Sequence, residues 1–333
     1  MHHLPQNLRI ALDDRHDLLV DAFLAGPPTH LFNTPEFFRL HAAAGGAGAG
    51  SHYFQLAEHA GEHALACLHF TEVSPGHWRS PARGTFGSFG YVDGIATGEL
   101  ELLLQGAERC LATLGARELV VVQPPGGHDA ARVGETTAML TRNGYTMLHA
   151  DINQDLQVDE RLLPERMSRG NLKRFRKCMR EGWQFVELPQ ARHAEAYQLI
   201  ADNRRRRGHP ITMSHEGLVT MDRLFPGRVH YFALVHEGRP EDMAASAICM
   251  RITTDILYVF YWGDAADMQT LSPVVGLAAG IYEYCRHEGI HILDAGISTA
   301  QGIPNPGLLH FKQGLGFSES PRATLMKRMT AHA

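Results

Sequence analysis

The sequence has few cysteines and no paired cysteine motif. Its 333 residues include five, and no two of them are separated by only two residues. They are Cys67, Cys110, Cys178, Cys249 and Cys285. An odd number at wide spacing argues against a disulfide framework and against a cysteine zinc site. We therefore expect a protein of a reducing compartment, the cytoplasm.

Long apolar runs and a strong excess of one charge are also missing. No apolar run approaches the ~18–20 residues that a membrane-spanning helix needs, and the N-terminus lacks a charged-then-apolar signal pattern. The net charge of −5 predicts no DNA partner and leaves nucleic-acid contact to a local patch. A hydrophobic content of 44% and a charged content of 20% are typical of a soluble globular protein.

The 21 histidines form two pairs at a spacing of four, the spacing that directs two rings of one helix at a metal ion. His59 and His63 flank a glycine, and so do His287 and His291. Each glycine marks a predicted turn, so neither pair lies on one uninterrupted helix. We predict no metal site.

The chain carries one order of elements twice, beginning with a hairpin. Residues 53–58 and 64–70 are alternating runs around a glycine turn, and residues 231–237 and 244–252 repeat the pattern. Such runs predict two antiparallel strand pairs. Another strand, at residues 256–262, follows the second hairpin.

A helix, a strand and a further helix follow each hairpin block. The first helices end near Gly115 and Gly289, and the second helices end at Gly144 and Gly316. The corresponding glycines lie 174 and 172 residues apart. Such similar offsets favour a structural duplication over chance.

This element order predicts an α/β fold, in the α+β sense of a mixed sheet with helices packed over it. A chain of this length supports two cores. We therefore predict two tandem lobes, residues 1–160 and residues 161–333, and place the candidate active site in the second.

The segment from Ile292 to Phe317 gathers polar groups in an apolar setting. A short apolar run ends at Asp294, a glycine-rich loop carries Ser298 and Asn305, and a lone Lys312 follows in an apolar segment. Polar groups that converge at a strand end are typical of ligand sites in α/β proteins. This segment is therefore the candidate active site.

Two of these residues are catalytic candidates, each with a structural alternative. Lys312 either extends to water or points into the cleft, where it stabilises an oxyanion or a substrate carboxylate. Asp294 either caps the loop that follows it or has a site role, in which it orients the substrate amine or pairs with Lys312. The matching first-lobe segment, residues 118–145, lacks the aspartate, the Ser-Thr loop and the lysine. That asymmetry favours the site roles.

The substrate-binding candidates end predicted strands or lie in loops. They are Tyr261, Trp262, Asp264, Ser298, Asn305, Ser88 and Phe89. An aromatic pair at a strand end is more often part of the core, and loop serines and asparagines often bond only to their own loop. We expect Ser88 and Phe89 to line the opposite wall, between the lobes.

Two basic runs lie near the predicted join. In the first, Lys173, Arg176, Lys177 and Arg180 share one face of a predicted helix, whereas the apolar Leu172, Phe175 and Met179 share another. The second run spans residues 204–207. Each run is either a solvated face or a phosphate-binding surface. The predicted donor-phosphate ligands are Lys173, Arg176, Lys177, Arg204, Arg205 and Arg207.

Several of these segments resemble the GNAT acyltransferase fold, and within it the tandem-lobe branch that includes the Fem-type aminoacyltransferases. The resemblance is carried by NLKRFRKCMREGW, ILYVFYWGDA, SPVVGLAAGIYEYCRHEGI, LDAGIST and GLLHFKQGLGF. In that branch the last helix often starts Gly-Leu and carries Phe-Lys, which match Gly307-Leu308 and Phe311-Lys312 here. The resemblance covers residues 166–320 well and the first lobe more loosely.

The resemblance implies an N-acyltransferase in which a substrate amine attacks an activated acyl carbon directly. The acceptor would be an amine of a small molecule or of a cell-wall-type precursor. The donor, used as a co-substrate, would be acyl-CoA or aminoacyl-tRNA. The sequence shows no Ser-His-Asp or Cys-His pattern of the kind that would indicate a covalent intermediate. A non-catalytic relative that binds a ligand or RNA is the alternative.

One departure bears on the donor. Coenzyme-A-using lobes hold the pyrophosphate on a glycine-rich turn at a helix N-terminus. Here the equivalent turn, residues 267–276, has a single glycine. Ser272 is expected to cap the helix, with Pro273 in its first turn. The missing glycines make a tRNA-borne donor a serious rival to coenzyme A.

Overall fold

The computed structural model describes residues 8–13, 30–44, 50–58, 64–82, 84–209 and 211–329. Contacts divide the chain into two compact units. Unit 1 comprises Met1–Asp151 and Pro321–Ala333, and unit 2 comprises Ile152–Ser320. The predicted lobes, 1–160 and 161–333, stay a prediction of domain organisation. His59 and His63 lie outside the described residues.

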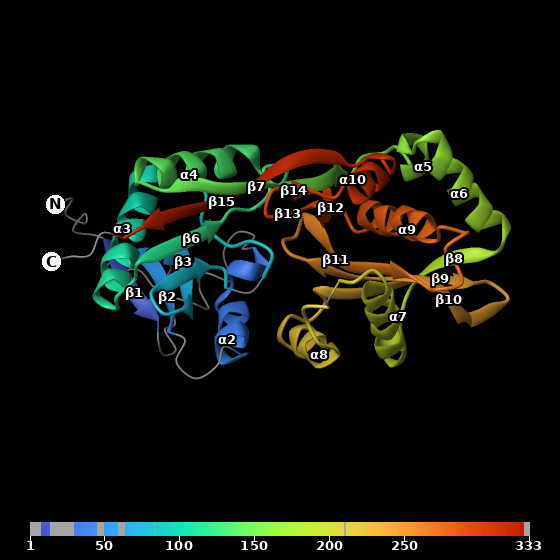
Figure 1. The fold of residues 1–333 in the computed structure, drawn as a ribbon, viewed down its shortest axis with the longest axis horizontal. Coiled ribbons are helices and arrows are strands. Elements are labelled where there is room, and N and C mark those ends of the chain that lie inside the picture. Colours follow the sequence, from blue (N-terminus) through green and yellow to red (C-terminus); the bar gives the residue numbers. More distant parts are fainter. Residues whose placement is uncertain are drawn as a thin grey trace. The chain divides into compact units, whose positions relative to one another are not determined.

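Unit 1 is a sheet with helices on both faces (Figure 1). Its strands are β1 (Leu8–Asp13), β2 (Ser51–Glu58), β3 (Ala64–Ser74), β4 (His77–Ser80), β5 (Gly90–Tyr91), β6 (Glu118–Val122), the first half of β7 (Thr146–Gln157) and most of β15 (Ser318–Arg328). Its helices are η1 (Leu31–Asn33), α2 (Pro35–Ala44), α3 (Thr97–Thr113) and α4 (Ala130–Arg142). The order β1-β2-β3-β4-β6-β15 includes one parallel pair, β4 with β6.

The two faces of this sheet differ in chemistry because side chains alternate along a strand. One face carries Phe54 and Leu68, which pack with α3 and α4 in the apolar core. On the other face, Tyr53 and Cys67 pack against Phe38 of α2. The second face also buries polar side chains.

Unit 2 is built on the same plan. Its strands are the second half of β7, β8 (Trp183–Glu187), β9 (Val229–His236), β10 (Arg239–Arg251), β11 (Ile256–Asp264), β12 (Ile292–Ile297) and a small hairpin, β13 (Thr299–Ala300) with β14 (Ile303–Pro304). Its helices are α5 (Leu163–Arg166), α6 (Arg169–Arg180), η2 (Gln190–Arg192), α7 (His193–Arg206), α8 (His215–Leu224), α9 (Val274–His287) and α10 (Pro306–Gln313). The main sheet runs β7-β12-β11-β10-β9-β8.

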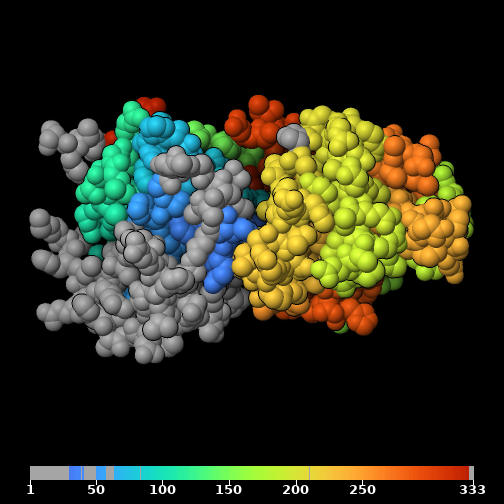
Figure 2. Space-filling view, turned by 90° about the horizontal axis from the view of Figure 1, so that it is seen from below, coloured from blue at the N-terminus to red at the C-terminus, as the bar shows by residue number. Residues whose placement is uncertain are grey.

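Helices cover both faces of the unit 2 sheet. α9 packs on one face, with α6 against it, and α7 packs on the other (Figure 1). Seen from below, α7 and α8 spread over that second face of the unit (Figure 2). The largest apolar core of the unit lies between the sheet and α9 and includes Leu257, Val259 and Leu293.

The predicted duplication is visible in the elements. β2 with β3 and β9 with β10 form the two antiparallel hairpins. A helix, a strand and a second helix follow in each unit, α3-β6-α4 and α9-β12-α10. Gly115 and Gly289 follow the first helices with φ of 81° and 64°, a backbone conformation that glycine adopts readily. The predicted α/β fold with mixed sheets is therefore confirmed.

In unit 2, one pair of parallel strands separates early. β11 and β12 pair in parallel only from Ile256 with Ile292 to Tyr258 with Asp294. On its other side β12 pairs with β7, and that register shifts between Asp294 and Ile297. The end of β12 is thus bulged, and its next residues enter the β13-β14 hairpin.

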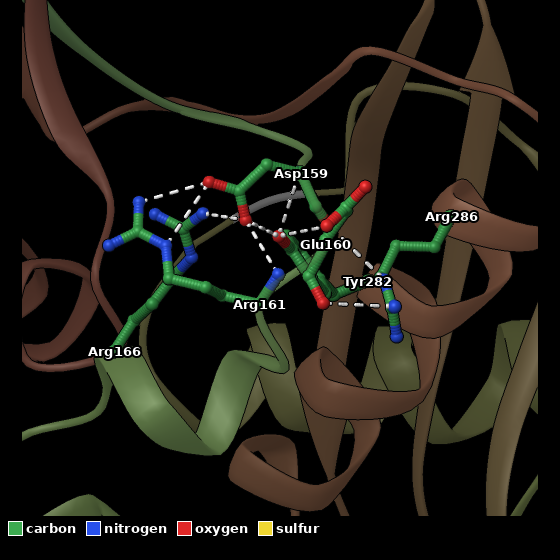
Figure 3. Close-up of polar contacts among 6 residues, drawn as sticks. All are labelled: Asp159, Glu160, Arg161, Arg166, Tyr282 and Arg286. Atoms are coloured by element: carbon green, nitrogen blue, oxygen red, sulfur yellow. Dashed lines mark hydrogen bonds and ion pairs between the residues drawn. The ribbon is translucent and has the colours of Figure 1, made fainter.

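An ion-pair network fixes the connection from β7 to α6 (Figure 3). The Asp159 carboxylate accepts a hydrogen bond from Arg161 (2.9 Å) and pairs with Arg166 at 2.5 Å. These two arginines hold the pKa of the Asp159 carboxyl well below its usual range. Arg286 of α9 donates to the carbonyl oxygens of Asp159 (3.2 Å) and Glu160 (3.0 Å). The network joins residues 159–166, which lead into α6, to α9.

Two glycines inside helices make a matched test of this packing. A Cβ added at Gly280 of α9 would overlap the ring of Phe185, whereas one added at Gly134 of α4 would meet nothing within 4 Å. We expect Gly280→Ala to lower the free energy of unfolding by about 1–3 kcal/mol. Gly134→Ala should raise it by about 0.5–1 kcal/mol. Urea denaturation measures both, and an equal effect of the two changes would contradict the packing.

Candidate active site at the end of β12

Lys312 is buried inside unit 2. Only 1% of the residue is exposed, so its ammonium does not extend to water. Nζ donates to the carbonyl oxygens of Gly296 (2.9 Å) and Ile297 (3.1 Å). Burial lowers the pKa of Lys312 to about 7, although the nearby Asp294 carboxylate acts in the opposite direction. An amine with such a pKa changes charge near neutral pH.

Asp294 holds the other side of the same bulge. Its carboxylate is fully buried and accepts hydrogen bonds from the Gly296 amide (2.7 Å) and from Asn153 Nδ2 (2.9 Å). Gly296 has a φ of 73°, in the region that glycine favours. The predicted capping of the following loop is therefore present. The Asp294 carboxylate acts to raise the pKa of the Lys312 amine, and the predicted pairing of the two groups stays a prediction.

Three consecutive polar residues on β7 support these groups, and the sequence reading missed them. Asn153, Gln154 and Asp155 are at most 5% exposed. Gln154 Nε2 donates to the carbonyl oxygen of Leu309 in α10 (3.2 Å). Asp155 accepts a hydrogen bond from the Ser320 hydroxyl (2.5 Å). The available signal was this polar triplet directly before the apolar Leu156 of the same strand.

Ser298 and Asn305 bracket the β13-β14 hairpin. The Ser298 hydroxyl is buried and donates to Gln154 Oε1 (2.5 Å). The Asn305 amide donates to the Ser298 carbonyl oxygen (2.9 Å), and the Asn305 side chain caps α10 by accepting from the Leu308 amide (3.1 Å). Both residues bond to their own loop and its neighbours. Their predicted substrate contacts stay predictions.

The predicted binding residues of β11 hold α7 and the loop after it. The Tyr261 hydroxyl accepts hydrogen bonds from the Thr212 amide (3.2 Å) and the Met213 amide (3.1 Å). Asp264 is 6% exposed and accepts a hydrogen bond from Asn203 of α7. These contacts occupy both side chains within unit 2.

The remaining predicted binding residues lie in two places. Trp262 contacts Phe311 of α10 edge-on, with ring centroids 6.1 Å apart, and so joins β11 to the helix that carries Lys312. Ser88 and Phe89 are buried within unit 1, Phe89 in its apolar core. Their predicted place opposite the second-lobe site stays a prediction.

The two basic runs differ in how their charges are used. In α7, Arg204 lies over the Tyr261 ring at 5.1 Å, and Arg205 pairs with Asp202 at 2.5 Å. Arg206 and Arg207 each lie 3.7 Å from Asp264. Nearby partners therefore engage the whole run, and its predicted contacts with donor phosphates stay a prediction.

The α6 cations are mostly available. Arg169, Lys173, Arg174, Arg176 and Arg180 are exposed. Within the described part of the chain, Lys177 is the α6 cation that pairs with a carboxylate, that of Glu181 at 3.8 Å. We call the five exposed cations the α6 cation row.

The docked side of α6 differs in one residue from the prediction. Leu172 and Phe175 pack against the unit 2 core, but Met179 is 41% exposed and Cys178 is buried instead. Cys178 Sγ donates to the carbonyl oxygen of Leu271 (3.7 Å), just before α9. Burial raises the pKa of this thiol to about 11, while the Gly276 amide bonded to it acts in the opposite direction. The N-terminus of α9 is therefore covered by α6.

The capping of α9 also differs from the prediction. The N-cap is Pro273, which makes no side-chain hydrogen bond. Ser272 has a φ of 54°, and its hydroxyl donates back to the Gln269 carbonyl oxygen (3.4 Å). The predicted Ser272 cap is wrong because the turn before the helix takes up the hydroxyl.

The equivalent N-terminus in unit 1 is acidic. At α3, the Glu99 carboxylate accepts a hydrogen bond from the Ala96 amide (2.9 Å), and Thr97 bonds to Glu135. A carboxylate at a helix N-terminus satisfies the amides that would otherwise bind an anion. Neither helix N-terminus presents an open phosphate cradle.

The described residues contain neither a cluster suited to a metal ion nor a helix suited to a membrane span. Within the described ranges, no three His, Cys, Asp or Glu side chains gather as a metal ion would require. His287 ends α9 and His291 precedes β12, so the pair does not share a helix. No helix in the described part of the chain is long and apolar enough to span a membrane.

Comparison of the coordinates with solved structures identifies the fold. FemX matches with a TM-score of 0.69 over 96% of this chain and 97% of its own, at 11% identity. A conserved protein of unknown function from Bacteroides thetaiotaomicron matches with a TM-score of 0.58 over 96% and 100%, at 10% identity. The chain shares the fold of FemX along nearly its whole length.

A third solved structure also has a similar fold. L-PGS from Bacillus licheniformis matches with a TM-score of 0.55 over 80% of this chain and 82% of its own, at 10% identity. No protein-family model matches the sequence, and no curated protein matches it. The relation is therefore one of fold, and the predicted likeness to the fold of Fem-type proteins is confirmed.

Burial of Lys312 predicts a pH-dependent stability. The pKa of Lys312 is about 7 in the folded protein, against an ordinary value of 10.5. Between these values the unfolded chain holds a proton that the folded chain releases, so a rise in pH favours folding. The stability of the wild type relative to Lys312→Met should therefore grow from about pH 7 to about pH 9, by at most about 1.4 kcal/mol per pH unit.

Urea denaturation at the two pH values measures this difference. Lys173→Met removes an exposed lysine and serves as the control, whose difference from the wild type should not change. A Lys312→Met difference that also stays constant would contradict the buried amine.

Proposed function

We propose that this protein is an N-acyltransferase that takes an aminoacyl group from tRNA and transfers it to an amine of a small-molecule or cell-wall-type acceptor. The observation that supports the choice of donor is the N-terminus of α9, which Cys178 of α6 covers: its Sγ donates to the Leu271 carbonyl oxygen, and its Cβ lies 3.6 Å from the position of a Cβ added at Gly276. A coenzyme A pyrophosphate would need the amides at that N-terminus free. The tandem-lobe GNAT fold is compatible with acyl transfer in general.

In this reaction the acceptor nitrogen attacks the carbonyl carbon of the aminoacyl ester. The C–N bond forms, the ester C–O bond breaks, and the amine proton ends on the departing ribose hydroxyl. The transition state carries negative charge on the former carbonyl oxygen. Catalysis requires positioning of the two reactants, a cation or donor for that oxygen, and a path for the proton.

Lys312 and Asp294 supply groups of the right kind in unit 2. The Lys312 ammonium is held by two carbonyl oxygens, and an ammonium has three donors. The third is our candidate for the oxyanion or for a substrate carboxylate. The Asp294 carboxylate places a negative charge near the Lys312 amine. It is our candidate for orienting the acceptor amine.

The α6 cation row supports a polyanionic donor. Five exposed cations lie within 12 residues of a chain whose net charge is −5. Because an acceptor stem presents many phosphates, such a row gains counterion release at each contact. The α7 arginines, which have internal partners, take a secondary part.

One observation favours a second candidate function. The known contacts of Lys312, Asp294 and Ser298 are all to other groups of unit 2. Such contacts are expected if these residues only support the β12 bulge and take no part in catalysis. The second candidate is thus a non-catalytic protein of this fold that binds RNA through α6.

Two donors distinguish these functions. The protein is incubated separately with a mixture of charged tRNAs and with acetyl-CoA, each with a panel of primary amines, and loss of the acyl group is followed. We expect amine-dependent loss from charged tRNA and none from acetyl-CoA. Lys312→Ala should reduce transfer by about 100-fold or more, the loss typical of an oxyanion donor.

The outcomes separate cleanly. Transfer from acetyl-CoA alone would overturn the choice of donor, and tRNA binding without transfer would support the non-catalytic candidate. Circular dichroism of Lys312→Ala is the control, because loss of folded protein in step with activity would assign Lys312 a structural role.

The α6 cation row predicts the salt dependence of tRNA binding. A variant with Lys173, Arg176 and Arg180 changed to Gln should bind tRNA more weakly. It should also lower the slope of log affinity against log salt by about 2–3.

The matched control removes the same charge elsewhere, at the exposed Arg109, Arg223 and Arg328. Filter binding at several salt concentrations measures both variants. Equal weakening by the two would show that net charge, rather than α6, attracts the RNA.

A further inference from the structure

Unit 1 carries two arginines on the buried polar face of its sheet. Across β6, Arg79 is the register partner of Val120, and Thr324 is the partner of Val122. Register partners, and residues two apart on one strand, lie on the same face. Arg79, Thr324 and Arg322 therefore share a face. The apolar core lies on the opposite face, with Leu119 and Val121.

Arg322 is buried and only partly satisfied. It is 8% exposed; Nη2 donates to Asp151 Oδ2 at 2.8 Å, and Nη1 donates to the Thr85 carbonyl oxygen at 2.9 Å. Its Nε is buried and has no hydrogen-bond partner among the described residues. An unpaired buried donor of a charged group is costly, so native structures rarely leave one without a reason.

Arg79 is the unbalanced charge. No described residue forms a hydrogen bond or an ion pair with its guanidinium. Burial, and then repulsion by Arg322, lower the pKa of Arg79, although a guanidinium stays charged in proteins. Both causes make this position unfavourable for a cation in the protein as it stands.

Among the described residues, Asp151 is the carboxylate beside these arginines, and it is already engaged. Asp151 is 2% exposed, accepts from Arg322, and lies 3.7 Å from His149 Nε2. Two guanidinium groups and one carboxylate leave one positive charge. The Thr324 hydroxyl on the same face is also buried without a hydrogen-bond partner among the described residues. Arg322 Nε and the Thr324 hydroxyl are therefore two buried donors that no described group satisfies.

We propose that this face of unit 1 is a binding site for one anionic group, a carboxylate or a phosphate of a small molecule. The Arg79 guanidinium offers a planar fork that matches either group. Arg322 Nε and the Thr324 hydroxyl are the unused donors that would complete it. One anionic group balances the charge, and its oxygens take up the unsatisfied donors. The site does not depend on the transfer reaction.

The proposal has an unusual consequence for stability. A cation held beside another cation and away from water opposes folding until its ligand binds. Arg79→Gln should therefore raise the melting temperature in an anion-poor buffer while it weakens anion binding. A residue kept for packing or for an internal ion pair would do the reverse.

Thermal melts and calorimetric titrations test the site with two probes, sodium phosphate and sodium acetate, against sodium chloride of equal ionic strength. At least one probe should raise the wild-type melting temperature beyond the chloride effect. Its Kd should weaken tenfold or more in Arg79→Gln and less in Arg79→Lys. Arg109→Gln, which removes an exposed unit 1 cation, is the control and should respond like the wild type.

The response identifies the ligand class. An effect of acetate alone assigns a carboxylate, and an effect of phosphate alone assigns a phosphate. The proposal is overturned if neither probe acts on the wild type, if Arg79→Gln responds fully, or if Arg79→Gln melts below the wild type in the anion-poor buffer.

Discussion

The contact of the Lys312 ammonium with the Gly296 and Ile297 carbonyl oxygens holds the candidate site together. It spans from α10 to the bulged end of β12, beyond the point at which β12 stops pairing with β11. Asp294 secures the amide side of the same bulge. With both groups in place, the β13-β14 hairpin and α10 have a fixed starting geometry.

Local patterns in the sequence predicted much of this architecture. Alternating runs around glycine turns located the hairpins, and Gly115 and Gly289 marked helix ends, because these signals depend only on neighbouring residues. The Asp294–Lys312 segment was found for the same reason, as polar residues in an apolar stretch. The element order then placed that segment in the second of two similar modules.

Other features depend on partners that are distant in sequence. Gln154 of β7 meets Ser298 and Leu309 only after the strands have paired. Arg206 and Arg207 have an acidic partner because Asp264 ends a strand 57 or more residues away. Cys178 covers the α9 N-terminus only once two helices have packed. No local pattern carries such information, and each of these contacts changed how a charged or polar residue is interpreted.

The division of the chain has a consequence for its synthesis. Unit 2 is one continuous segment, whereas unit 1 needs both Met1–Asp151 and Pro321–Ala333. The strand that pairs with β6 reaches it through Thr324 to Arg328, near the end of the chain. During translation unit 2 is therefore complete before unit 1, whose sheet lacks a strand until residues 321–328 have been made. The first half of the protein emerges first and finishes folding last.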